Sequence, residues 1–217
     1  VESIHANFER EFGIPFEDFR ALDLIGTQND SAEAIYNPEK YLLYCDPFMG
    51  QFDNRVKSGD AAGYADCAAR LAVYADHAEY GYLFRSLRAL CAFLSVKADL
   101  GIRTRAAYLS GDKKAAKALC TDYDAALERL DAFYAAYEQQ WMHENKPQGF
   151  DVVDLRIGGQ RQRLLHCRDR LLAYAEGQLD RIEELEEPVL DCCCEENADG
   201  QATRAIFWHE IASANVI

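Results

Sequence analysis

One segment rich in glycine gathers the side chains best suited to binding a polar ligand. Trp141 provides an aromatic face, while Glu144 and Asn145 provide oxygen acceptors. Lys146 and Arg156 add cationic donors. An ordinary connection between helices needs only a few residues, and functional groups gather on longer ones. These five side chains are therefore the candidate binding residues. The competing interpretation is that they hydrogen-bond the segment to itself.

The segment that carries these side chains, residues 141–159, separates two long helical patterns. Pro147, Gly149 and the Gly158–Gly159 pair fix or free its backbone at set points. Residues 150–155 are the single stretch of the chain that could form a strand, and the sequence predicts an extended loop around it.

The other reactive side chains give no convincing catalytic or metal-binding pattern. Eight cysteines are present, and Cys192, Cys193 and Cys194 form a run. A zinc site usually pairs two cysteines with a second pair or with histidines, and His209 is the only histidine near the run. Reduced thiols in a reducing compartment are the favoured interpretation, which predicts a cytoplasmic protein. We therefore predict no metal, no cofactor and no catalytic residue in this chain.

The composition limits the class of protein. The 217 residues are 49% hydrophobic, enough to form a substantial core, and the formal net charge is −14. Nucleic acid and anionic membrane surfaces are therefore poor partners, because binding them needs clustered Lys and Arg. No apolar run approaches the ~20 residues of a membrane span. The first residues lack a signal peptide and an initiator Met, and we expect a chain excised from a longer protein.

Helical periodicity dominates the sequence and predicts an all-α fold. We expect an irregular array or bundle of about seven to nine helices around one long central helix. The long helix is predicted over residues 111–143, where aromatic and aliphatic residues recur every three or four positions. Such a stripe is more often core than binding site. Shorter helices are expected over residues 3–12, after Pro15, over 59–100 with a break near Asp76 or Gly81, and over 103–110. Residues 40–53 are expected to form a short apolar element followed by a turn with Pro and Gly.

Two later helices are distinguished by their charge. Residues 160–174 alternate arginines with leucines, which predicts a solvent-facing helix paired with acidic neighbours. Residues 178–191 read as an acidic helix. A turn at 197–200 and a last helix over 202–212 complete the predicted array.

Several segments together resemble bacterial β-N-acetylhexosaminidases of glycoside hydrolase family 20. Residues 144–159 read Glu-Asn-Lys-Pro-Gln-Gly-Phe-Asp-Val-Val-Asp-Leu-Arg-Ile-Gly-Gly, similar to the family's Glu-Asn-Lys-Pro-x-Gly-Phe-Asp-Val-x-Asp-x-Arg-x-Gly-Gly. Residues 40–53 resemble its Tyr-Leu-Leu-Tyr-Asn-Asp-Pro-Leu-x-Gly-x-Phe-Asp stretch, with Cys45 in place of the Asn. The passage 8–23, the acidic run 181–187 and the ending 212–217 are also similar.

The resemblance implies a C-terminal helical accessory domain of an exo-acting enzyme that removes terminal N-acetylglucosamine. The family's catalytic Asp-Glu pair belongs to a (β/α)8 barrel, which needs ~250 residues and is absent here. The nearest analogue, Glu17-Asp18, has the reverse order. The implied partners are the barrel of the parent chain, a second copy in a homodimer, and carbohydrate. Trp141 would then stack on a sugar ring.

Two questions stay open at this point. Residues 1–25 either end the preceding barrel region or begin the helical domain, which then occupies residues 26–217. The alternative function is a stand-alone helical module that binds another protein through an apolar face.

Overall fold

The computed structural model describes residues 2–26, 38–57 and 59–189, and every regular element in these ranges is helical. This confirms the predicted all-α class. The elements are α1 (Glu2–Phe12), α2 (Phe16–Phe19), η1 (Arg20–Leu24), α3 (Pro38–Tyr44), η2 (Asp53–Arg55), α4 (Asp60–Ala72), α5 (Gly81–Lys97), α6 (Leu100–Leu109), α7 (Lys113–Glu144), α8 (Phe150–Ala175) and α9 (Glu183–Glu186).

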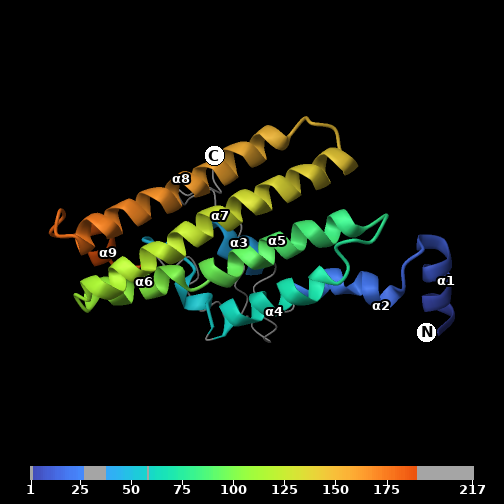
Figure 1. Ribbon diagram of the computed structural model, residues 1–217, viewed down its shortest axis with the longest axis horizontal. Helices are drawn as coiled ribbons and strands as arrows, with labels where there is room; N and C mark the ends of the chain where they lie inside the picture. The colour runs from blue at the N-terminus through green and yellow to red at the C-terminus, as the bar shows by residue number, and fades with distance from the viewer. Residues whose placement is uncertain (1, 27–37, 58, 190–217) are drawn as a thin grey trace, which may run out of the picture.

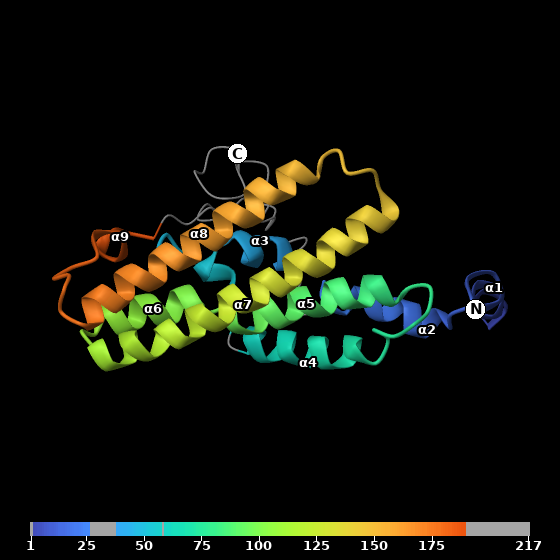
Figure 2. The same ribbon diagram turned by 45° about the horizontal axis from the view of Figure 1, so that its top comes forward.

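Four helices lie side by side in chain order: α4, α5, α7 and α8 (Figures 1 and 2). Helix α6 continues beyond α5, and both pack against α7. The long helix α7 therefore has α8 on one side and α5 with α6 on the other, as expected for a bundle built around it. Helix α3 lies behind this layer and packs against α5.

Helix α7 forms because both its N-terminal cap and the spacing of its apolar residues favour a helix. The Asp112 side chain caps the first turn by accepting a hydrogen bond from the Ala115 amide at 2.9 Å. Its buried residues then recur at three- and four-residue spacing: Ala116, Leu119, Cys120, Tyr123, Ala126, Leu127, Leu130 and Phe133. The aromatic stripe of the long helix is therefore core over most of its length.

The predicted break in the 59–100 region is confirmed. Helix α4 ends at Ala72 and α5 begins at Gly81. Gly81 is buried against the preceding chain, and a Cβ atom added there would lie 2.5 Å from the Ala75 carbonyl oxygen. The Arg85 guanidinium donates to the same oxygen at 2.6 Å, which fixes the turn between the two helices.

The expected loop over residues 141–159 is much shorter in the structure. Helix α7 continues through Glu144 and α8 begins at Phe150, so the connection comprises residues 145–149. The strand considered over residues 150–155 is wrong, since these residues are the first turns of α8. Phe150 and Ile157 are buried while Val152 and Leu155 are exposed, which is the periodicity of a helix.

The basic helix is confirmed as the later part of α8, and its arginines are paired with acidic groups. Arg161 contacts Asp131 at 2.7 Å, and Arg170 contacts Glu183 at 3.1 Å. Arg163 and Arg168 are likewise in ion pairs.

The acidic helix expected over residues 178–191 is reduced to α9, a single turn. Its start is extended at Ile182, and the backbone is extended again at Glu187, just before Pro188. Side chains of α6 hold this segment instead, because Tyr108 Oη accepts from the Ile182 amide at 2.9 Å. The Cys192–Cys194 run, the turn at 197–200 and the helix at 202–212 lie outside the described residues.

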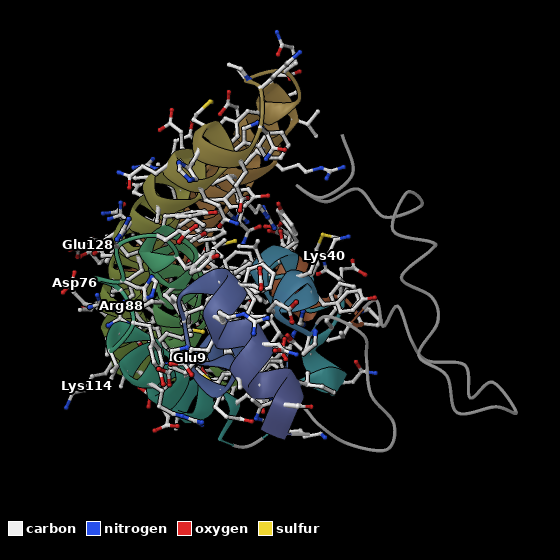
Figure 3. The ribbon with its side chains drawn as sticks, turned by 90° about the vertical axis from the view of Figure 1, so that its right-hand side faces the viewer. Glu9, Lys40, Asp76, Arg88, Lys114 and Glu128 are labelled. Carbon is white, nitrogen blue, oxygen red and sulfur yellow. The ribbon has the colours of Figure 1, made fainter. Side chains whose placement is uncertain are left out.

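The outer surface carries charges of both signs. Figure 3 shows Arg88 and Glu128 at the periphery of the helical layer, with Lys40 on another side of the molecule. Helix α1 stands apart at one end and packs on α2 (Figure 1). Among the described residues, no helix is both long and apolar enough to cross a membrane.

Candidate functional site

Trp141 lies at the tip of the α7–α8 hairpin and closes the connection between the two helices. Its indole Nε1 donates to the Lys146 carbonyl oxygen at 2.9 Å. Its ring lies 5.7 Å from the Phe150 ring and 6.4 Å from the Tyr137 ring, centroid to centroid. A Cβ atom at Gly149, where φ is +96°, would lie 3.4 Å from the indole. Much of the aromatic surface therefore contacts the protein's own tip.

Glu144 ends α7 and points across the bundle. The Tyr82 hydroxyl, from the start of α5, donates to its carboxylate at 3.0 Å, and Gln140 donates at 3.3 Å. Burial is the larger cause of the raised pKa of Tyr82, and the hydrogen bond to Glu144 raises this pKa further. Glu144, Asn145 and Lys146 all remain exposed.

Arg156 lies apart from the other four candidates. It is more than one turn into α8, and its Nε is buried without a hydrogen-bond partner within the described structure. Burial raises the pKa of Tyr44 to about 12, and the nearby Arg156 charge opposes this increase. The structure therefore gathers Trp141, Glu144, Asn145 and Lys146 at one tip and places Arg156 elsewhere.

A second cluster, which sequence reasoning missed, surrounds the turn from Cys45 to Asp53, called the 45–53 turn below. Asp46 is 6% exposed. Its Oδ1 accepts from the Phe48 amide at 2.8 Å and the Met49 amide at 3.0 Å, and its Oδ2 accepts from Arg163 Nε at 2.5 Å. Arg163 also donates to Glu184 at 2.6 Å. One buried carboxylate thus joins this turn to α8.

Two further cations bind backbone oxygens of the same turn. Lys97, which is 2% exposed, donates to the Cys45 carbonyl at 2.6 Å. Arg105 donates to the Phe48 carbonyl at 2.5 Å and to the Leu185 carbonyl at 2.7 Å. Three helices, α5, α6 and α8, therefore each contribute a cation to one turn, and Arg105 extends the network to α9.

Burial raises the pKa of one thiol and one carboxyl group inside this cluster. Burial raises the pKa of the Cys45 thiol to about 12. Burial also raises the pKa of Asp53, although the Lys97 and Arg105 charges oppose this. A thiol with a raised pKa is a poor nucleophile, so the cluster fits a structural clamp better than a catalytic centre.

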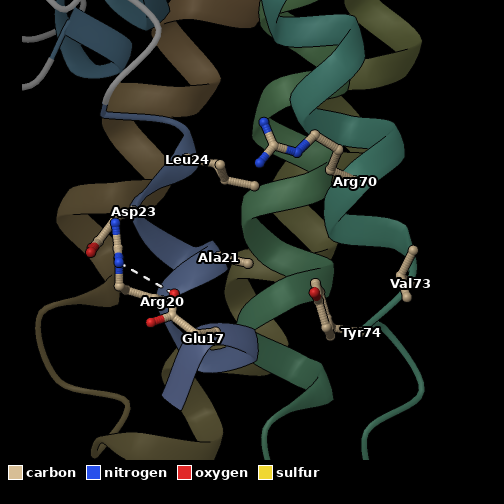
Figure 4. Close-up of a pocket in the computed structure, with 8 residues that line it drawn as sticks. All are labelled: Glu17, Arg20, Ala21, Asp23, Leu24, Arg70, Val73 and Tyr74. Carbon is tan, nitrogen blue, oxygen red and sulfur yellow. Dashed lines mark hydrogen bonds and ion pairs between the residues drawn. The ribbon is translucent and has the colours of Figure 1, made fainter. Parts of the chain in front are cut away.

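A small cleft between η1 and α4 is the third place with polar side chains (Figure 4). Its volume is about 440 Å³, and its lining includes Glu17, Arg20, Asp23, Arg70 and Tyr74. Arg20 pairs with Glu17 at 3.3 Å. Acidic and basic groups balance here, so the cleft favours neither an anionic nor a cationic ligand. In the described part of the chain, no group of three or more His, Cys, Asp or Glu side chains could hold a metal ion.

Glu39 provides a pH-dependent test of the packing around α3. Burial raises its pKa above 4.5, and its Oε2 has no hydrogen-bond partner within the described structure. The folded state therefore binds the proton of Glu39 more tightly than the unfolded state does. The stability that this contributes is fully present below pH 4.5 and is lost as pH rises through the pKa of Glu39 in the folded state. We expect Glu39→Gln to be more stable than the parent at pH 7, and we expect this difference to shrink below pH 4.5. Urea unfolding at both pH values measures it. Equal stability at pH 7 would contradict this.

Comparison with known families gives a match that covers most of the chain. No curated protein matches the chain at a significant level. A family described as the Glycoside Hydrolase 20C C-terminal domain matches residues 15–204. The match begins just before α2, extends over α3 to α9, and includes both the 45–53 turn and the tip of the α7–α8 hairpin. The chain belongs to the Glycoside Hydrolase 20C C-terminal domain family.

Proposed function

We propose that this chain is the accessory domain of an exo-acting β-N-acetylhexosaminidase that removes terminal N-acetylglucosamine. The observation that carries the proposal is the family match over residues 15–204. In this proposal the catalytic acid and its partner Asp lie on the barrel of the parent chain, and the helical domain supplies none of them. Five of the cysteines are buried and unpaired, which fits a protein kept in a reducing cytoplasm.

The barrel would contact this domain through α1. Ile4 is 63% exposed and Phe12 is 48% exposed, although both lie on the apolar side of an amphipathic helix. The helix packs on α2, and it precedes the matched region. By contrast, Phe19 already packs on Tyr80, so residues after α1 are joined to this domain. An exposed apolar face of this kind usually marks an interface.

The test compares the parent enzyme, its barrel segment and this chain. We expect the chain alone to leave 4-nitrophenyl N-acetyl-β-D-glucosaminide intact, and the parent enzyme to hydrolyse it. The separately produced barrel should bind this chain, and the paired change Ile4→Asp and Phe12→Asp should weaken binding. Val73→Asp is the matched control, because Val73 is 78% exposed at the end of α4. Hydrolysis by the chain alone would overturn the proposal.

The tip of the α7–α8 hairpin would face carbohydrate in the assembled enzyme. Glu144, Asn145 and Lys146 supply exposed polar groups beside the half-buried Trp141, and Arg156 would contribute from α8. Sugar-binding sites of this kind combine an aromatic surface with a few placed polar groups. We also propose that the parent enzyme is a homodimer.

Glu144 gives the more specific test of the tip, because Trp141 also holds the connection together. In the parent enzyme, Glu144→Gln should raise KM about tenfold with little change in kcat, as expected when uniform substrate binding is lost. Glu138→Gln is the control, since Glu138 is an exposed carboxylate on the same helix. Unchanged kinetics in Glu144→Gln would mean that the carboxylate serves only its contact with Tyr82.

A further inference from the structure

One side of α8 carries polar residues where a helix packed in a bundle usually carries apolar ones. Arg156, Gln160 and Arg163 follow each other at spacings of four and three residues, so they lie on the same side of the helix. Arg163 binds the buried Asp46 carboxylate of the 45–53 turn. Burial raises the pKa of the Tyr44 hydroxyl and the Arg156 charge opposes this increase, so Arg156 lies near Tyr44. This side, called the inner side of α8 below, therefore runs along residues 44–46.

Arg156 differs from the other arginines of α8 in lacking an acidic partner. The others are all in ion pairs: Arg161, Arg163, Arg168 and Arg170. Arg156 has no ion pair in the described part of the chain, although Asp and Glu number 37 in the sequence and Lys and Arg number 23. Its Nε is also buried without a hydrogen-bond acceptor there. A buried N–H that has lost water and gained no acceptor is unfavourable.

Gln160 has the same deficit one turn further along the inner side of α8. The residue is 1% exposed, and its Nε2 is buried without a hydrogen-bond partner within the described structure. Most buried polar groups in proteins are hydrogen-bonded, so two unpartnered groups on neighbouring turns of one helix need an explanation. Both groups are N–H donors, which means that the missing partner supplies oxygen acceptors.

A carboxylate matches this pair of donors better than water does. Water can accept a hydrogen bond, but it leaves the charge of Arg156 unbalanced, whereas hydrogen bonds between a guanidinium and a carboxylate are among the strongest in proteins. The inner side of α8 already contains one such arrangement, because Asp46 accepts from Arg163 and from backbone amides of its own turn. Arg156 is only partly buried, so its guanidinium can be reached from outside the chain.

We propose that Arg156 and Gln160 form a binding site for a carboxylate group that is supplied from outside this chain. One carboxylate oxygen accepts from Arg156 Nε and the other from Gln160 Nε2. The site adds a second class of ligand to the carbohydrate contacts proposed above and does not depend on them. Since an arginine side chain has five N–H groups, a contact through Nε leaves others for carbohydrate.

Side-chain NMR resonances of the isolated chain test the site directly. The probe is sodium acetate, which replaces sodium chloride step by step at neutral pH so that the ionic strength stays constant. We expect the Nε–H resonance of Arg156 and the amide resonances of Gln160 to shift along one saturable curve, half complete at about 1–30 mM acetate. Arg161 is the control within the same sample, because its Nε already donates to Asp131 at 2.7 Å and should not respond.

Two variants establish that the response comes from these residues. Arg156→Gln should weaken acetate binding at Gln160 about tenfold, and Gln160→Met should weaken it at Arg156 about threefold. Circular dichroism establishes that both variants remain folded. A shift at Gln160 that survives Arg156→Gln unchanged, or an equal shift at Arg161, would overturn the inference. Resonances of Arg156 and Gln160 that ignore acetate would also overturn it, since water or the chain itself would then satisfy both donors.

The parent enzyme distinguishes two sources of the carboxylate. If the ligand is a small carboxylate from solution, acetate should raise the melting temperature of the parent enzyme relative to chloride, and Arg156→Gln should abolish the rise. If an acidic side chain elsewhere in the parent enzyme fills the site, acetate should have no such effect, and Arg156→Gln should lower the melting temperature in both salts. A parent enzyme indifferent to acetate and to Arg156→Gln would contradict the site. The hydrolysis test decides the enzymatic role separately.

Discussion

Asp46→Ala is expected to cost about 3–5 kcal/mol of unfolding free energy, because it leaves buried cationic and amide groups without their acceptor. Asp46 is 6% exposed and accepts from the Phe48 and Met49 amides and from Arg163. The side chain thus determines the shape of the 45–53 turn and joins it to α8. Urea unfolding followed by circular dichroism measures the loss.

Two further variants make this prediction specific. Asp46→Asn keeps an oxygen for the backbone amides but removes the charge facing Arg163, so its loss should be smaller. Asp131→Ala is the control, because Asp131 makes a two-nitrogen contact with an arginine of the same helix at the surface. An exposed pair contributes about 0.2–1 kcal/mol. If Asp46→Ala and Asp131→Ala lost equal unfolding free energy, burial would not increase the contribution of the Asp46 pair to stability.

The long helices were predictable because the information for them is local. In α7, the Asp112 cap and the spacing of Leu119, Tyr123 and Leu130 can all be read within one segment. The break before Gly81 was predictable for the same reason. Even the salt-bridged character of α8 followed from arginines alternating with leucines.

The start of α8 was misjudged because its local preference and its packing disagree. Val152 and Val153 are β-branched and favour a strand. Phe150 and Ile157, however, are buried in the folded chain, and Phe150 contacts the Tyr134 ring of α7 at 5.8 Å. Packing against α7 favours a helix here, and this packing cannot be read from the local sequence.

The candidate sites were only partly predictable for a related reason. Four tip residues are neighbours in sequence, so their proximity followed directly. The clamp around the 45–53 turn takes Lys97, Arg105 and Arg163 from three different helices. Partners so distant along the chain have no spacing pattern. The one usable indication was Asp46 within an apolar run, since a buried carboxylate needs a partner.

Gly81→Ala is expected to destabilise the chain by about 1–3 kcal/mol, although alanine is the better helix former. The added Cβ would lie 2.5 Å from the Ala75 carbonyl oxygen and 3.2 Å from its carbon, both backbone atoms. Moving that carbonyl also disturbs the hydrogen bond from Arg85. The strain therefore falls on the turn that sets α4 against α5. Urea unfolding measures the change.

Gly158→Ala is the matched control, because the same chemical change meets open space. It should stabilise the chain by about 0.5–1 kcal/mol. A Gly81→Ala variant as stable as the parent would mean that the turn relaxes around the new methyl group.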